Sequence, residues 1–534
     1  MKYRRKALAV AVSAGLASTA LMHQARAQTD PQTQRKIDEL QRQLDELKTE
    51  RRAAPAATGG HEFLERKPGD GITFFTRGGE VSLYGNLDVS FDYATKGING
   101  MTGNGGPTDV PAGNGGWMAD ISSNLSYVGV RGFQTVGSGN SFRFVYQLET
   151  QIDVSVTPGT PQTNSNQGQR VADALVSRNS FIGIASPAWG AMKIGKTDAP
   201  YKNSTARMNA FSGMPGDYSV IMGNTGGDNR VEFGTRMSHA VWYESPSWGG
   251  LRFNLLFSPG QNRADDSSNI PAGEPECAGG NSPGSGGLPG ACNDGSFSNA
   301  WSTNVSWEGM GLYVTGAYEK HSKVNRTSDL FGVVSNPNAI PGSGGFDPND
   351  VADETAWKIG AQYRFAPTRT TVSGILERMK RNVPGYLEPQ DERSRNGFWL
   401  ALSQEVTSAD SVHLGWAHAA KAKGDPGQHN PPASAVPDPF LGFGFADADN
   451  RADMFTIALK HAFDRNLSTY VNYATTRNKP FAHYDLGAGG RSVTTDCHDG
   501  SNTDVTGFDP HAGAPKCWTG AKLQAFSVGM KYQF

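Results

Sequence analysis

The amino-acid sequence predicts an all-β fold, a transmembrane antiparallel β-barrel of about sixteen strands. The clearest strand runs from Val81 to Tyr93, where odd-numbered positions are apolar or small and even-numbered positions are polar, apart from Tyr84. Alternation over thirteen residues is typical of a tilted strand that crosses a bilayer with one face toward lipid. Because lipid offers no hydrogen-bond partner to a free sheet edge, such strands must close into a barrel.

The lengths of the connections predict the number of strands. Seven tight turns are expected, near 136–140, 187–190, 246–250, 308–311, 366–368, 407–410 and 464–466. Eight long polar loops are expected, near 95–121, 154–174, 198–236, 259–298, 322–353, 382–394, 423–450 and 479–521. Fifteen connections join sixteen strands, and a barrel of that size leaves an aqueous channel. Short turns in the periplasm and long loops outside are typical of outer-membrane barrels.

Composition agrees with a barrel that is wet inside and apolar outside. Of 534 residues 66 are glycine, while hydrophobic residues make up 37% and aromatic residues 10%. These values indicate many turns and strands that are half polar, whereas a large soluble domain needs a greater apolar share. After residue 27 no apolar stretch approaches the roughly 18 to 20 residues of a membrane-spanning helix, which excludes a helical membrane protein.

Residues 1–27 resemble a cleaved secretory signal. A basic cluster from Lys2 to Lys6 precedes an apolar run from Ala7 to Leu21, and the small residues Ala25 and Ala27 mark a cleavage site after Ala27. An uncleaved membrane anchor is the alternative. Cleavage removes five basic residues, so 44 basic groups face 51 acidic groups and the formal charge is −7. That charge excludes a nucleic-acid partner.

The mature N-terminus predicts a helix followed by a linker. Within residues 28–54, Ile37, Leu40, Leu44 and Leu47 follow three-four-three spacing, which indicates a coiled coil of about two heptads. We interpret this segment as a periplasmic trimer stalk, stabilised because a tethered oligomer raises its effective concentration; a single solvated helix is the alternative. Residues 55–78, rich in glycine and proline, are expected to be a linker, and residues 79–534 the barrel.

The cysteines predict two disulfides in an exported chain. Four cysteines form two close pairs within glycine-rich and proline-rich segments, so we expect Cys277 to pair with Cys292 and Cys497 with Cys517. Metal binding is the alternative, although no CxxC spacing is present. Neither a metal nor another cofactor is expected.

Six segments carry a resemblance to a known family: LYGNLDVSFDYA (83–94), SYVGVRG (126–132), FVYQLET (144–150), SRNSFIGI (177–184), AVWYESPSWGGL (240–251) and FSVGMKYQF (526–534). Together they resemble the trimeric general-diffusion porins of Gram-negative bacteria over nearly all of residues 79–534. The resemblance implies a homotrimer of sixteen-stranded barrels, with the third external loop, 198–236, folded inward. It also implies that Phe534 is the signal read by the barrel assembly machinery. The N-terminal coiled coil is outside the usual pattern and keeps a substrate-specific uptake role open.

The resemblance and the strand parity together predict the pore-lining residues. Arg131 and Arg178 match positions of the family's arginine ladder, whereas Tyr127 and Trp242 replace basic residues there. Parity with outward Phe144 and Leu148 turns Arg143 and Glu149 toward the lumen. The inner loop adds charges of both signs, for which a solvated charge or a salt bridge is the alternative to solute contact: Arg207, Asp217, Asp228, Arg230 and Glu232.

The functional expectation is a passive outer-membrane channel for small hydrophilic solutes, whose other contacts are outer-membrane lipid and lipopolysaccharide. Three other roles stay open: a substrate-specific porin for small organic acids or sugars, a barrel enzyme, and a structural tether. An enzyme needs a nucleophile beside a histidine on neighbouring strands. His413, His418 and His461 are available, but no nucleophile motif accompanies them. No catalytic residue is therefore expected.

Overall fold

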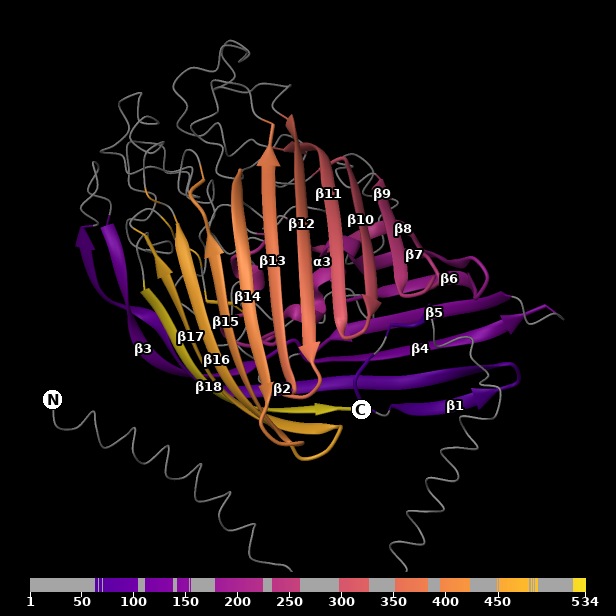
Figure 1. Ribbon diagram of the computed structural model, residues 1–534, viewed down its shortest axis with the longest axis horizontal. Helices are drawn as coiled ribbons and strands as arrows, with labels where there is room; N and C mark the ends of the chain where they lie inside the picture. The colour runs from indigo at the N-terminus through magenta and orange to yellow at the C-terminus, as the bar shows by residue number, and fades with distance from the viewer. Residues whose placement is uncertain are drawn as a thin grey trace, which may run out of the picture. The chain divides into compact units, whose positions relative to one another are not determined.

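The computed structural model describes residues 63–65, 67–69, 71–103, 111–137, 142–152, 154, 178–223, 233–259, 297–325, 351–382, 394–422, 449, 451–479, 482, 484, 486–487 and 522–534. Nearly all of these residues form one antiparallel sheet within the compact unit Gly60–Phe534 (Figure 1). The predicted signal peptide, the coiled coil and all four cysteines lie outside the described residues. Within these residues, no helix has the length and apolar character that a bilayer crossing requires.

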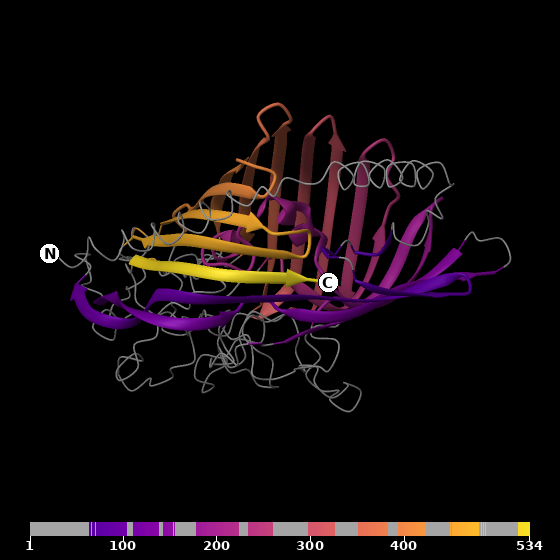
Figure 2. The same cartoon turned by 90° about the horizontal axis from the view of Figure 1, so that it is seen from below.

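Eighteen strand segments make up the sheet, and each pairs with its neighbours in antiparallel register. Their bounds are β1 (Ile72–Thr76), β2 (Gly79–Gly103), β3 (Pro111–Ser123), β4 (Tyr127–Val136), β5 (Phe142–Gln151), β6 (Ser180–Ser186), β7 (Gly190–Asp198), β8 (Arg236–Glu244), β9 (Leu251–Pro259), β10 (Asn299–Gly309), β11 (Leu312–Asn325), β12 (Val351–Phe365), β13 (Thr370–Arg381), β14 (Arg395–Glu405), β15 (Asp410–Ala419), β16 (Ala452–Ala462), β17 (Leu467–Asn478) and β18 (Lys522–Gln533). The sheet closes because β18 pairs with β2 and β9 pairs with β10 (Figure 2).

The eighteen segments occupy sixteen strand positions around a closed barrel. Successive parts of β2 pair with β4 and then β3 on one side, and with β1 and then β18 on the other. The segments β3 and β4 thus share one strand position, and so do β18 and β1. Phe534 joins the C-terminal end of the sheet to β2, since the Gly85 amide donates to the Phe534 carbonyl oxygen at 2.7 Å. The predicted sixteen-stranded barrel is confirmed.

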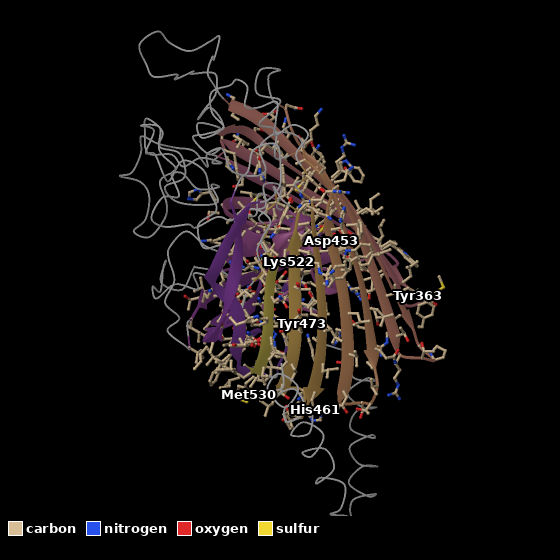
Figure 3. The ribbon with its side chains drawn as sticks, turned by 90° about the vertical axis from the view of Figure 1, so that its left-hand side faces the viewer. Tyr363, Asp453, His461, Tyr473, Lys522 and Met530 are labelled. Atoms are coloured by element: carbon tan, nitrogen blue, oxygen red, sulfur yellow. The ribbon has the colours of Figure 1, made fainter. Side chains whose placement is uncertain are left out.

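Side chains alternate between a lipid-facing and an inner face. In β18, Phe526, Val528 and Met530 are exposed on the outer face, whereas Ala525 and Ser527 are fully buried. Figure 3 shows the outer side chains of several strands, including Tyr363 and Met530. The apolar outside satisfies the bilayer, and the polar positions turn inward as the period of two requires.

The predicted turns are confirmed, because each of the seven falls between two strands paired as a hairpin. The expected loop at 95–121 is wrong in its extent. Strand β2 continues to Gly103 and β3 begins at Pro111, with irregular register at Thr95–Gly97 and Ile98–Gly100. Backbone pairing needs no apolar side chains, so a ladder of glycine and asparagine residues extends the hairpin beyond the alternating pattern.

The interpretation of 55–78 as a linker is also wrong for its described part. Residues Ile72–Thr76 form β1 and pair with Gly79–Leu83 across a tight turn at Arg77 and Gly78. Gly78 has a φ of 84°, which glycine adopts without steric cost. Among the described residues, Gly78 lies in this turn, and Pro68 and Gly69 lie in bends that precede it.

Candidate functional site

A loop between β7 and β8 folds into the barrel, as predicted for the third loop. We call its described residues, 198–223 and 233–235, the inner loop. It contains α3 (Pro200–Thr205) and two 3-10 turns, η2 (Ala206–Met208) and η3 (Tyr218–Val220). Helix α3 begins with proline at its first position, where no amide donor is needed. The Tyr201 amide donates to Ser302 Oγ at 2.9 Å, which fixes the helix against the inner face of β10.

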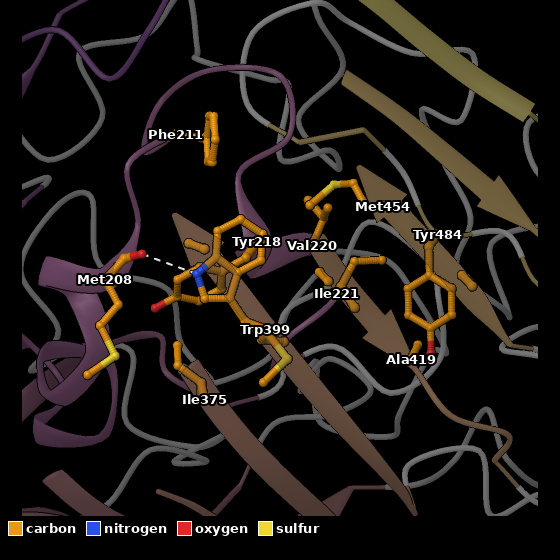
Figure 4. Close-up of a cluster of buried hydrophobic side chains, with 14 of the residues drawn as sticks. Met208, Phe211, Tyr218, Val220, Ile221, Ile375, Trp399, Ala419, Met454 and Tyr484 are labelled. Carbon is orange, nitrogen blue, oxygen red and sulfur yellow. Dashed lines mark hydrogen bonds between the residues drawn. The ribbon is translucent and has the colours of Figure 1, made fainter. Parts of the chain in front are cut away.

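An apolar cluster holds the inner loop against β13–β16 (Figure 4). Trp399 is fully buried, and its indole N–H donates to the Met208 carbonyl oxygen at 3.1 Å. Its ring lies 5.9 Å from Phe211 and 5.3 Å from Tyr218, centroid to centroid. A Cβ on Gly415 would lie 2.2 Å from the Trp399 ring, so the indole occupies space that a larger residue at 415 would need.

Polar anchors complete the attachment of the inner loop. Glu377 accepts the Tyr201 hydroxyl at 2.6 Å and the Gly223 amide at 2.7 Å, so one carboxylate holds two distant points of the loop. Lys460 donates to the Ala210 carbonyl oxygen at 2.5 Å, and Asn472 donates to the Pro215 carbonyl oxygen at 2.7 Å. The loop therefore lies fixed across the inner wall rather than hanging free in the lumen.

A second segment lies on the opposite inner wall. We call its described residues, Phe63–Glu65 and Lys67–Gly69, the N-terminal segment. Phe63 and Leu64 are buried against Val145, Ala185 and Ala191, all inward-facing residues of β5–β7. Lys193, whose side chain is 1% exposed, donates to the Phe63 carbonyl oxygen at 2.7 Å. In the part of the chain that the structure describes, two segments lie inside the barrel, of which the sequence predicted one.

The N-terminal segment completes a buried network of charges. Lys67 Nζ lies 2.8 Å from a carboxylate oxygen of Glu65 and 2.8 Å from one of Glu149. Glu149 also accepts from Arg178 Nε at 2.5 Å and from the Tyr84 hydroxyl at 3.0 Å. The Glu149 side chain has no exposed surface, so each of its charge-assisted bonds acts away from bulk water.

The network keeps Glu65 and Lys67 ionised. Burial acts to raise the pKa of Glu65, but the charge of Lys67 and the hydrogen bond from Gln147 outweigh it and hold that pKa below 4.5. Burial acts to lower the pKa of Lys67, and the opposing attraction of Glu65 and Glu149 holds that pKa above 10.5. Both groups are therefore charged at every pH between 4.5 and 10.5.

Asn179 links the two inner segments. Its Nδ2 donates to Glu65 Oε1 at 2.6 Å and to Asp198 Oδ2 at 3.2 Å. Its Oδ1 accepts from the Asp198 amide at 3.0 Å and from Arg236 Nε at 2.7 Å. Asp198 also pairs with Lys202 at 2.9 Å, at the beginning of the inner loop. One amide thereby positions the N-terminal segment relative to the base of the inner loop.

The predicted wall residues lie on the inner face near the N-terminal segment. Arg131 donates to the Glu65 carbonyl oxygen. The Tyr127 ring lies 4.6 Å from the Arg178 guanidinium carbon and 5.2 Å from Lys67 Nζ. Arg143 lies over the Phe133 ring at 5.6 Å. Trp242 is 4% exposed and donates its indole N–H to Glu244 at 2.8 Å, so its ring is covered.

Of the five charged residues predicted for the inner loop, the structure describes two, Arg207 and Asp217. Arg207 is 42% exposed, pairs with Glu308 at 2.9 Å and lies over the Tyr313 ring at 4.4 Å. Asp217 is buried and accepts from Asn209 Nδ2 at 2.8 Å and from the Ser219 amide at 3.0 Å, so its carboxylate shapes the loop itself. The remaining three lie outside the described residues: Asp228, Arg230 and Glu232.

Sequence reasoning missed the N-terminal segment, its partners Asn179 and Lys193, and Glu244, which pairs with Lys193. Parity finds Lys193, because Met192 and Ile194 face outward on either side of it. No local sequence signal identifies Glu65, because its hydrogen-bond donors Gln147 and Asn179 lie 82 and 114 positions further along the chain.

A cavity of about 180 Å³ lies between the two inner segments. Its polar lining includes Glu65, Asp198, Asn203, Glu244, Arg252 and Asn254. Hydrogen-bond acceptors and one guanidinium therefore border the same space. Among the residues that the structure describes, no three histidine, cysteine, aspartate or glutamate side chains gather to hold a metal ion.

A closed sixteen-stranded barrel with an apolar exterior, a polar interior and an inward loop defines an outer-membrane channel rather than an enzyme. A family model described as Gram-negative porin matches residues 53–480. The chain belongs to the Gram-negative porin family, and the protein resides in the outer membrane.

Three solved structures are similar to this chain, and the first of them shows the same fold. An anion-selective porin from Comamonas acidovorans aligns with a TM-score of 0.51 and 15% identity, covering 85% of this chain and 100% of that one. OmpF of Salmonella typhi in complex with daunomycin aligns with a TM-score of 0.46 and 15% identity, over 87% and 100%. The outer membrane channel DcaP of Acinetobacter baumannii aligns with a TM-score of 0.45 and 9% identity, over 87% and 100%. Comparison with curated proteins finds no match.

Proposed function

We propose that this porin is a water-filled channel for passive diffusion of small hydrophilic solutes and ions. The observation that carries the proposal is the pairing of a closed sixteen-stranded barrel with a polar inner wall and an anchored inner loop. A barrel of this size leaves an aqueous lumen, and a fixed inner loop narrows it without moving parts. Opposed charges across the narrowing orient polar solutes and disfavour apolar ones.

A substrate-specific porin is the second candidate. The cavity beside the inner loop favours it, because Arg252 and Asn254 offer donors while Glu244 and Asp198 offer acceptors within one space. Such a lining fits a small organic acid or a sugar better than a simple ion.

Recordings from purified protein in planar bilayers test the channel function. We expect discrete current steps that rise linearly with voltage, because the inner loop is held by buried contacts. Liposome swelling with sugars, amino acids and carboxylates then separates the two candidates. Rates graded by solute size support general diffusion, and one solute faster than its smaller analogues supports the specific porin. A silent bilayer contradicts both.

We also propose that the protein is a homotrimer, with residues 28–54 forming a periplasmic coiled coil and lipopolysaccharide contacting its outer surface. The heptad spacing in 28–54 and the family membership support this assembly. Phe534 is proposed as the signal for the barrel assembly machinery; its ring stacks on Tyr532 at 5.9 Å.

Deleting residues 28–54 tests the role of the stalk. We expect trimers that still fold, because the barrel forms its own sheet, but that dissociate at a lower temperature on a semi-native gel. Full-length protein heated in parallel is the control. Appearance of monomers alone contradicts an auxiliary stalk and makes the coiled coil essential for assembly.

A further inference from the structure

We propose that the N-terminal segment sets the ion selectivity of the channel, with Glu65 and Lys67 as the residues that determine it. This inference rests on the proposed function, since it names the charges that act on solutes in the same lumen. Strand parity suggests that the arginines on the inner wall of the barrel are open to the lumen. In this protein the chain's own N-terminal segment covers part of that wall.

The wall's basic side chains donate to the backbone of the segment. Arg131 donates to the Glu65 carbonyl oxygen, and Lys193 donates to the Phe63 carbonyl oxygen at 2.7 Å. Lys193 also contacts both carboxylate oxygens of Glu244 at 2.8 Å. Lys193 is buried and uses its three donors on these acceptors, so none is left for a solute.

The segment also changes the charge balance of the wall. The described wall around the segment includes the cations Arg131, Arg178 and Lys193 and the carboxylates Glu149 and Glu244. Among the described residues of the segment, Glu65 and Lys67 add one charge of each sign. Removal of the Glu65 charge therefore makes the local charge of the wall more positive, and removal of the Lys67 charge makes it more negative.

Glu65 is placed to act on the channel water. Its side chain is 26% exposed, and it borders the cavity between the two inner segments. Lys67 is 11% exposed on the same network. A charge at such a boundary acts through the low-dielectric wall on ions in the lumen and is screened less than a charge on the outer surface.

Reversal potentials across a salt gradient test the inference in the full-length protein. We expect Glu65→Gln to shift the permeability ratio toward anions by about twofold, and Lys67→Gln to shift it toward cations by about the same factor. The double variant E65Q/K67Q is expected to return to the wild-type ratio. As the control, Asp410→Asn removes an exposed carboxylate that pairs at 2.7 Å with His461, which Figure 3 labels, and it should leave the ratio unchanged.

Opposite shifts separate electrostatic control from a purely structural role. If the segment only fills space, both single variants loosen it and shift the ratio in the same direction, which overturns the inference. A conducting wild type with unchanged ratios in both variants also overturns it and leaves the proposed function intact. A wild type that passes no current refutes the proposed function itself. Because only folded channels insert and conduct, a reversal potential reports on folded protein in every arm.

Discussion

Replacing Trp399 with alanine is expected to lower the free energy of unfolding by about 3–5 kcal/mol and to make the open channel noisy. The indole is fully buried between β14 and the inner loop, and its N–H holds the Met208 carbonyl oxygen. Truncation removes the ring contacts with Phe211 and Tyr218 and leaves a cavity that Gly415 cannot fill. The loop then keeps its polar anchors at Glu377 but loses its apolar one.

Single-channel recording and denaturant titration in detergent micelles check this result. We expect larger current fluctuations and a higher mean conductance, because the loop moves away from the lumen axis part of the time. Trp357→Ala is the matched control, since Trp357 lies 44% exposed on the outer face of β12. Its loss should leave the current unchanged. Equal noise in both variants would show that Trp399 does not anchor the loop.

The barrel was predictable from the sequence because lipid imposes one rule on every strand. A residue on the outer face must be apolar, so strands such as Val81–Tyr93 and Ala525–Phe534 reveal their parity directly. The hairpin of β2 and β3 beyond Ala94 was missed because it is held by backbone pairing, with many glycines and no alternation. Alternation of apolar and polar residues arises where one face of a strand contacts lipid. Outside the bilayer no such requirement acts on the side chains, so the alternation is absent.

The site was only partly predictable for a related reason. Inward parity of Glu149 and Arg178 follows from outward neighbours, whereas their partner Lys67 lies in a segment rich in glycine and proline that resembles a linker. Its contacts are made with residues far away in the chain and often through backbone carbonyl oxygens, which carry no sequence signal. The buried role of Asp217 within the loop was equally hidden, because an exposed and a capping aspartate look alike in sequence.

Replacing Glu149 with alanine is expected to cost about 3–5 kcal/mol of folding free energy, the range found when one partner of a buried ion pair is removed. The carboxylate has no exposed surface and is shared by Arg178 and Lys67, with the Tyr84 hydroxyl as a third donor. Its loss leaves the Arg178 and Lys67 cations in a poorly solvated site, where their donors lack an acceptor. Chemical unfolding in detergent micelles measures the loss.

Glu405→Ala is the control, because Glu405 pairs with Arg364 at 2.8 Å while both side chains are about half exposed. Exposed pairs contribute about 0–1 kcal/mol, so this variant should unfold close to wild type. A double-mutant cycle with Arg178→Ala then isolates the pair. Since removing both charges avoids a stranded guanidinium, the double variant should cost less than the sum of the two single variants, by about 0.5–3 kcal/mol. Strict additivity would mean that the 2.5 Å contact between Glu149 and Arg178 contributes nothing to the fold.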